Sequence, residues 1–310
     1  MKLCGATVAV TGATGFLGRY LVRALIERGA RVVGVVRTPE RGRDLAAQGV
    51  ELRRADLAER ENLASAFAGV DAVISNAALL SLRPRAWQEF VRTNVDGTVH
   101  VFEAMAAAGV RRAVQISSVS AYRNYRCPVR EDHPLYDAAT HGSRWNAYGL
   151  SKALSEEAAW RLAKEGGIAL TVLRPSGIYG AFDRNFTRIH KILVTRPPVT
   201  FYPVLMRVCL VYAGDVADAA VRALENPVAE GKAYNVSGDD LSTWAFAEAW
   251  ARAGARRQIR IPLPLPYRRI YSGERIRTDL GWRPRPYDAG IRELLATEAA
   301  AGREGRGAPA

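Results

Sequence analysis

The sequence predicts an α/β fold built on a doubly wound parallel sheet with helices on both faces. In the first half of the 310 residues, short apolar segments alternate strictly with segments of helical periodicity, as parallel strands joined by crossover helices require. The apolar segments are also nearly continuous runs of Val, Ile and Ala, such as those at 31–37 and 71–78. Runs of this kind are typical of strands that are covered on both faces.

The elements of this fold can be placed in chain order. Strands are expected at 6–12, 31–37, 50–57, 71–78, 112–122, 169–180 and 232–238. Helices are expected at 18–30, 61–69, 94–109, around Tyr148, and at 214–226, 243–254 and 289–301. Periodicity is weak between 181 and 210, and the proline-rich segment 262–266 is expected to form a stiff turn.

The chain has a net charge of +13 but lacks the pattern of a nucleic-acid-binding protein. Its arginines are spread along the sequence in short doublets such as Arg256-Arg257, and no basic helix stands out. We therefore expect arginine-rich solvated surfaces and no nucleic-acid partner. A positive field of this size can still attract anionic substrates or a phosphorylated cofactor.

Cysteine and histidine usage points to a reducing compartment and no metal site. Cys4, Cys127 and Cys209 are odd in number and far apart, so a cytoplasmic location without a disulfide framework is expected. The four histidines show no metal-ligand spacing. The apolar start is interrupted by TGATG before a signal-peptide core is complete, and no segment approaches about 18 uninterrupted apolar residues. No membrane span is expected.

A glycine-rich turn, TGATGFLG, joins the first expected strand to the first helix. Such a turn lets the backbone approach a pyrophosphate, which is then stabilised by the N–H groups and dipole of the helix N-terminus. The glycines are three residues apart instead of following the Gly-x-Gly-x-x-Gly fingerprint. The loop nevertheless predicts a nucleotide site, with contacts from Gly12, Thr14, Gly15, Phe16, Leu17 and Gly18.

Arg37 ends the second expected strand, nineteen residues after Gly18. An acidic residue there would bind the adenosine ribose hydroxyls and repel a 2′-phosphate, whereas a guanidinium can pair with that phosphate. Thr38 and Arg41 are close enough in sequence to help. The sequence thus favours NADP(H) over NAD(H), with an ordinary surface arginine as the alternative.

Tyr148 and Lys152, in NAYGLSK at 146–152, are one helical turn apart and share a helix face. A free phenol titrates near about 10. A cation within about 4–6 Å would lower that pKa towards the working pH, as general acid/base catalysis prefers. Alone the pattern is weak, because such pairs also occur by chance on exposed helix faces.

Together these segments resemble the extended short-chain dehydrogenase/reductase family. The resemblance runs from TGATGFLG to LGWRP at 280–284. Between them lie, in the family's order, ADL at 55–57, NVDGT at 94–98, SSVSAY at 117–122, NAYGLSK, LRPSGIYG at 173–180 and GDVADA at 214–219. One such segment could be an accident, but six in order hardly can.

The resemblance implies three catalytic residues. Tyr148 is expected to be the general acid/base, Lys152 its pKa-lowering partner and a ligand of the nicotinamide ribose, and Ser118 the hydrogen-bond partner of the substrate oxygen. Further cofactor contacts are implied for Asp56, Leu57, Asn76, Ala77, Ala78, Asn94, Ser117, Pro175, Gly177 and Ile178. Local capping remains the alternative for Asp56, and a helix N-cap for Asn94.

The implied fold is a Rossmann-like domain with a smaller C-terminal substrate-binding domain. Residues 1–178 are expected to bind the nucleotide, with 211–238 returning to them. The substrate-binding domain then comprises 179–210 and 239–301, and 302–310 is expected to be a disordered tail. Family members often dimerise through two long helices, which here lie near 94–108 and 146–164, so a homodimer is expected.

The expected reaction is NADP(H)-dependent interconversion of a carbonyl and a secondary alcohol in a small molecule. The alternative is an NAD-dependent nucleotide-sugar epimerase built on the same three residues. Dehydration is disfavoured because Val119-Ser120 follow Ser118 where the 4,6-dehydratase branch carries Asp-Glu. Arg37 and the apolar segment 201–215 favour the reductase. A silent cofactor-binding protein is least favoured, since it needs no such triad.

Overall fold

The computed structural model describes residues 1–60, 62–80, 87–123, 127–140, 147–183, 187–188, 191, 199–203, 205–254, 259–264 and 267–304. Its main sheet has the strand order β10-β6-β5-β4-β1-β2-β3, with every neighbouring pair parallel. The strands are β1 (Thr7–Thr11), β2 (Arg31–Val36), β3 (Glu51–Arg54), β4 (Ala72–Ser75), β5 (Arg112–Ile116), β6 (Ala169–Pro175) and β10 (Ala233–Val236). This arrangement confirms the predicted doubly wound parallel sheet.

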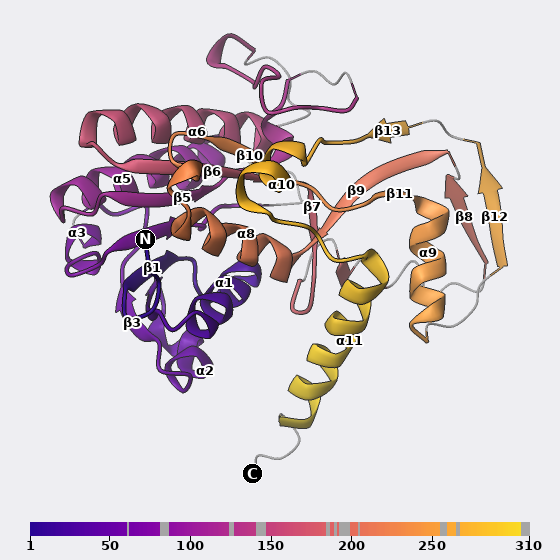
Figure 1. Ribbon diagram of the computed structural model, residues 1–310, viewed down its shortest axis with the longest axis horizontal. Coiled ribbons are helices and arrows are strands. Elements are labelled where there is room, and N and C mark those ends of the chain that lie inside the picture. The colour runs from indigo at the N-terminus through magenta and orange to yellow at the C-terminus, as the bar shows by residue number, and fades with distance from the viewer. Residues whose placement is uncertain are drawn as a thin grey trace.

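Helices cover both faces of the main sheet (Figure 1). On one face lie α1 (Phe16–Glu27) and α8 (Ala213–Glu225), whose apolar residues share one core cluster with β1, β2 and β10. On the other lie α3 (Leu63–Ala66), α5 (Gly97–Ala107) and α6 (Ala147–Gly166), which form a second cluster. Two short helices, α2 (Arg43–Ala46) and α4 (Trp87–Phe90), lie in the connections. The sheet is thus buried on both sides, as its Val- and Ile-rich strands require.

The expected strand at 169–180 is split between two sheets. Its first part is β6, and its second part, β7 (Gly177–Tyr179), pairs with β9 (Met206–Tyr212) instead. The break falls at Ser176, whose amide donates to the carbonyl of Val236 in β10 (3.0 Å). One apolar run therefore leads the chain out of the main sheet, which periodicity alone does not reveal.

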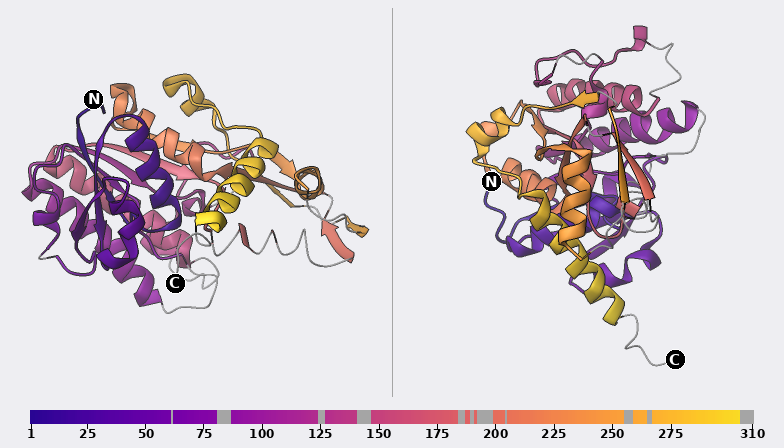
Figure 2. Two further views of the ribbon diagram at one scale, coloured as in Figure 1. Left: turned by 90° about the horizontal axis from the view of Figure 1, so that it is seen from below. Right: turned by 90° about the vertical axis from the view of Figure 1, so that its right-hand side faces the viewer.

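A second group of elements follows β7. In a four-stranded sheet, β9 lies between β11 (Asp240–Ser242) and β13 (Tyr267–Arg269) and also pairs with β7. The parallel pair of β8 (Val199–Pro203) and β12 (Ile259–Leu263) lies with α9 (Thr243–Arg252) at the end of the molecule away from the main sheet (Figures 1 and 2). Part of the expected stiff turn is thus strand, because Pro262 and Leu263 belong to β12, while 265–266 lie outside the described residues.

The C-terminal segment packs back on α8. It comprises α10 (Glu274–Leu280), the LGWRP motif and α11 (Tyr287–Glu304). The Trp282 indole is 0% exposed and donates to the carbonyl of Asp215 (2.9 Å). Arg285 pairs with the Asp215 carboxylate through its Nε (2.6 Å). Residues 302–304 of the expected tail are part of α11, and 305–310 lie outside the described residues.

None of the helices in the described ranges combines the length and the apolar character that crossing a membrane requires.

Trp282→Ala should lower the free energy of unfolding by about 3–5 kcal/mol, because it empties a fully buried site and removes the hydrogen bond to Asp215. Urea denaturation would measure the loss. Trp244, which is 36% exposed, offers the matched control, and Trp244→Ala should cost about 1 kcal/mol. Equal losses for the two variants would show that Trp282 does not anchor the C-terminal segment.

Candidate active site

A cleft of about 2000 Å³ opens where the strands of the main sheet end. Residues just after the carboxyl ends of five parallel strands line it: Gly12, Arg37, Asp56, Asn76 and Ser117. The strand order changes direction at β1, which lies between β4 and β2. Ligands of open α/β sheets bind at such a switch point, because the two adjoining connections leave on opposite faces and open a crevice.

The glycine loop brings the backbone to the cleft. Gly12 has φ +67°, a left-handed conformation that glycine adopts readily, and a Cβ there would lie 3.0 Å from Ala77. Gly15 is the N-cap of α1, so the first turn of that helix receives no side-chain cap, and Gly15, Phe16 and Leu17 line the cleft. Thr14 lines it as well. The N-terminus of α1 thus lies at the cleft without a side-chain cap, as the binding of a pyrophosphate at a helix N-terminus requires.

Gly18 has a different role from the other two glycines. A Cβ at Gly18 would lie 2.1 Å from the carbonyl oxygen of Gly12 and 2.7 Å from that of Ala13. The missing side chain therefore lets α1 pack closely against the loop that precedes it.

A threonine that the sequence analysis missed holds this loop in place. The buried hydroxyl of Thr11 accepts hydrogen bonds from the amides of Asn76 (2.9 Å) and Ala77 (3.1 Å). In return, the Asn76 side chain donates to the Thr11 carbonyl (3.2 Å). The ends of β1 and β4 are thereby joined next to the cleft, which Asn76, Ala77 and Ala78 line. A threonine at the end of the first strand, directly before the glycine loop, was the available signal.

The far end of the cleft is cationic. The exposed side chains of Arg37 and Arg41 line it, and the carbonyl of Thr38 accepts from the Arg41 amide (3.1 Å). Asp56 also lines this end while its carboxylate accepts from the amide of Ala58 (3.0 Å). Asp56 thus makes a local turn contact and also lines the cleft. Leu57 lies beside it in the lining.

The three expected catalytic residues come together at the other end. Tyr148 and Lys152 line the cleft from α6, and Ser118 hydrogen-bonds the Tyr148 hydroxyl. The hydroxyl of Ser118 is itself held, because it accepts from the amide of Ser120 (3.1 Å). The Lys152 ammonium, 3% exposed, donates to the carbonyl of Ile116 at the end of β5 (2.6 Å). The loop that carries Ser118 and helix α6, although distant in sequence, therefore contact each other at Tyr148.

The pKa values at this end differ from the expectation. Burial raises the pKa of Tyr148, and the Ser118 hydrogen bond opposes this rise only in part. Burial also lowers the pKa of Lys152 to about 8, against the raising effect of the Glu156 carboxylate. The sequence predicted a tyrosine pKa lowered by the lysine, whereas desolvation raises the pKa of Tyr148 here.

Asn94 lies outside the described lining of the cleft and is not a helix N-cap. It is 2% exposed within a π-helical segment, Val91–Asp96. Its amide accepts from the backbone N–H of Leu79 (2.6 Å) and donates to the Leu79 carbonyl (3.1 Å) and the Ser151 hydroxyl (2.9 Å). Asn94 therefore links the chain after β4 to α6. Its partner on α6 is Ser151, which immediately precedes Lys152.

The remaining predicted contacts divide into two groups. Ser117 and Ile178 line the cleft. Outside its lining, as far as the structure describes it, lie Gly18, Thr38, Asn94, Pro175 and Gly177. Pro175 and Gly177 are close in sequence to Ile178, so their backbone helps to place that residue.

Several lining residues were not predicted from the sequence. They come from the segment after β7 and from α11: Phe182, Asp183, Thr187, Arg188, Lys191 and Glu298. Lys191 forms an ion pair with Glu298. Of the described lining residues, eight are Arg or Lys and five are Asp or Glu, so the cleft favours an anionic ligand. No group of three or more His, Cys, Asp or Glu side chains in the described part of the chain is placed to hold a metal ion.

Comparisons with known proteins agree with this geometry. The model of the NAD-dependent epimerase/dehydratase family matches residues 8–237. Cinnamoyl-CoA reductase 1 of Petunia hybrida is 32% identical over 249 residues, which are 74% of this chain and 72% of the relative. A short-chain dehydrogenase/reductase superfamily protein from Agrobacterium tumefaciens, solved with bound NAD, is 27% identical with a TM-score of 0.76, covering 97% of this chain and 99% of that one.

The fold is also shared with more distant proteins. UDP-glucose 4-epimerase from Thermotoga maritima has a TM-score of 0.79 at 19% identity and covers 95% of this chain and 99% of its own. At this identity the likeness shows a common fold.

Gly18→Ala should weaken NADPH binding about tenfold or more, because the added methyl group must displace the Gly12 carbonyl and overpacking costs about 1–3 kcal/mol. Fluorescence titration of NADPH would measure it. Gly273→Ala is the matched control, since the nearest atom to its Cβ is 3.8 Å away. Parent-like affinity in Gly18→Ala would show that the loop tolerates this displacement.

Proposed function

The chain belongs to the NAD-dependent epimerase/dehydratase family and is an NAD(P)-dependent oxidoreductase of the extended short-chain dehydrogenase/reductase type, and we propose that it reduces a carbonyl compound with NADPH. The observation that carries the proposal is that Tyr148, hydrogen-bonded by Ser118, and Lys152 line the same cleft as the glycine loop. A carbonyl group placed beside Tyr148 has a proton donor and a hydrogen-bond partner at hand.

The raised pKa of Tyr148 supports the reductive direction. Its phenol stays protonated at neutral pH and can donate its proton to the substrate oxygen as the carbonyl becomes an alcohol. When bound, NADPH supplies the hydride that goes to the carbonyl carbon. Ser118 orients the substrate oxygen, and the Lys152 ammonium stabilises the phenolate that Tyr148 becomes. The same groups run the oxidation in reverse.

The cationic end of the cleft supports a preference for NADPH over NADH. Arg37 lines it directly after β2 and Arg41 from the turn that follows, and the adenosine ribose of a dinucleotide lies after the second strand. Two guanidinium groups favour a 2′-phosphate through charge-assisted hydrogen bonds. If Arg37 were an ordinary surface arginine, its position in the lining of the cleft would serve no purpose.

The substrate is expected to be partly apolar. Leu79, Leu80 and Phe182 line the cleft, and Leu80 and Phe182 are each 48% exposed, so their apolar surface is available to a ligand. The Petunia relative is named for cinnamoyl-CoA, an aromatic acyl compound. We therefore place aromatic or other apolar carbonyl compounds first in a substrate screen.

We further assign residues 1–178 with 211–238 to cofactor binding and 179–210 with 239–301 to substrate binding. A homodimer through the outer faces of α5 and α6 and a cytoplasmic location complete the proposal. The free thiols of all three cysteines suit a reducing compartment. Light scattering of the purified protein would test the dimer.

Tyr148→Phe should reduce carbonyl turnover by about 10²–10⁴-fold, because the variant loses its proton donor. Steady-state NADPH oxidation with cinnamoyl-CoA and a panel of aromatic aldehydes and ketones would measure the loss. NADPH affinity should stay near that of the parent, which shows that the cleft is intact. Parent-like turnover in this variant would refute the mechanism.

Arg37→Asp should weaken NADPH binding by about tenfold to a hundredfold, because a charge-assisted hydrogen bond contributes about 1.5–3 kcal/mol. NADH binding should change little. Arg43→Asp, on α2 and outside the described lining, is the matched control for charge alone. Equal affinities of the parent for NADPH and NADH would show that Arg37 does not select the cofactor.

Identifying any nucleotide released on denaturation separates the reductase from the epimerase. An epimerase regenerates its cofactor in each cycle and can retain NAD, whereas a reductase exchanges NADPH at every turnover. Tightly held NAD in the purified protein would count against the reductase.

A further inference from the structure

A buried carboxylate lies one helical turn beyond Lys152. Glu156 is on α6, 1% exposed, and follows Tyr148 and Lys152 at successive intervals of four residues, so the three share one helix face. An ionised side chain at this depth is costly unless it is paired and hydrogen-bonded. The residues that contact Glu156 therefore indicate its role.

The partners of Glu156 come from β6, from the end of β5 and from α6 itself. Arg174 of β6, also buried, donates through Nε to both carboxylate oxygens (3.1 Å each) and through Nη2 to one of them (2.5 Å). The hydroxyl of Ser117 donates to the other oxygen (2.7 Å), and the Trp160 indole makes a longer contact (3.4 Å). Ser117 lines the cleft and immediately precedes Ser118.

Arg174 in turn is fixed by groups that do not face Lys152 directly. Its Nη1 donates to the Tyr122 hydroxyl (2.8 Å) and to the carbonyl of Glu131 (3.1 Å). The Tyr122 hydroxyl donates to Asn235 of β10 (2.6 Å). The Tyr122 hydroxyl stays protonated at neutral pH, because burial raises its pKa to about 12.

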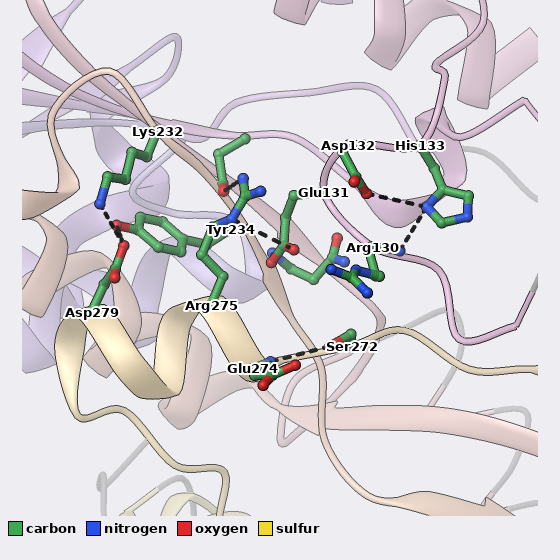
Figure 3. Close-up of polar contacts among 12 residues, drawn as sticks. Arg130, Glu131, Asp132, His133, Lys232, Tyr234, Ser272, Glu274, Arg275 and Asp279 are labelled. Carbon is green, nitrogen blue, oxygen red and sulfur yellow. Dashed lines mark hydrogen bonds and ion pairs between the residues drawn. The ribbon is translucent and has the colours of Figure 1, made fainter.

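The carboxylate of Glu131 closes the far end of this network. It accepts from the amide of Asn235 (3.0 Å) and points toward Arg275, whose Nε lies 3.9 Å away (Figure 3). The charged groups around Lys152 are thus Glu156 on its own helix and Arg174 on β6, with Glu131 and Arg275 beyond. Glu156 is the acidic group among them whose field raises the pKa of Lys152.

We propose that Glu156 is a positioning residue for the reaction: it keeps the buried ammonium of Lys152 charged beside Tyr148 and holds Ser117, and with it Ser118, against α6. This inference rests on the proposed roles of Tyr148 and Lys152. A purely structural role, in which the ion pair with Arg174 only fastens α6 to β6, is the alternative that the experiment must separate.

The first test measures the charge of Lys152 without turnover. Acetylation of Lys152 by acetic anhydride, followed by mass spectrometry across a pH series, reports the pH at which the amine loses its proton, about 8 in the parent. In Glu156→Gln this midpoint should fall by about one pH unit or more, because the opposite charge is gone while Arg174 remains. Glu157→Gln, the same change at the exposed neighbouring position, should leave it unchanged.

The second test follows the consequence for catalysis. Carbonyl reduction needs the charged lysine, so kcat should decline above about pH 8 in the parent and at a correspondingly lower pH in Glu156→Gln. A midpoint lowered by one pH unit leaves about half as much charged lysine at pH 7 and about a fifth as much at pH 8, so kcat should fall by about those factors, while KM for NADPH changes little. Glu156→Asp keeps the charge and should restore the parent's pH profile.

Removing one partner of a buried ion pair can prevent folding. The double variant Glu156→Gln/Arg174→Met removes both charges and is expected to fold. Its Lys152 midpoint should still lie below that of the parent. A parent-like midpoint in either folded variant would overturn the proposal. Because labelling needs neither substrate nor cofactor, this result is independent of whether Tyr148→Phe refutes the proposed reaction.

Discussion

The common direction of the strands is the constraint on which the rest of the structure depends. Because neighbouring strands of the main sheet are parallel, their carboxyl ends meet at one edge. Residues that follow β1, β2, β3, β4 and β5 are therefore neighbours although they are far apart in sequence. The reversal of strand order at β1 opens a crevice at that edge, which the glycine loop and the start of α1 line.

Close packing at this edge then fixes what the crevice can bind. The absence of a side chain at Gly12 and Gly18 lets β1, α1 and the chain after β4 approach within van der Waals contact. Thr11 and Asn76 join the two strand ends by hydrogen bonds. The result is a loop held by backbone and small side chains next to the first turn of α1, and a helix N-terminus favours an anionic group.

Burial has opposite consequences for Tyr148 and Lys152, the two proposed catalytic residues on α6. Desolvation favours the neutral form of each, so it raises the pKa of Tyr148 and lowers that of Lys152. A protonated phenol suits carbonyl reduction, but a neutral lysine would not stabilise the phenolate that forms. An acidic side chain near the lysine counters this loss, and Glu156 occupies that position together with its own cationic partner, Arg174.

The sequence by itself determined the parallel sheet, the glycine loop, Arg37 and the Tyr148–Lys152 pair, because each depends on local periodicity or spacing. Tertiary structure decided the rest. It moved β7 out of the main sheet, gave Asn94 a clamping role, and paired Glu156 with Arg174. It also brought residues 182–183, 187–188 and 191, together with α11, to the cleft. These outcomes depend on contacts between distant segments and on desolvation, neither of which a sequence pattern records.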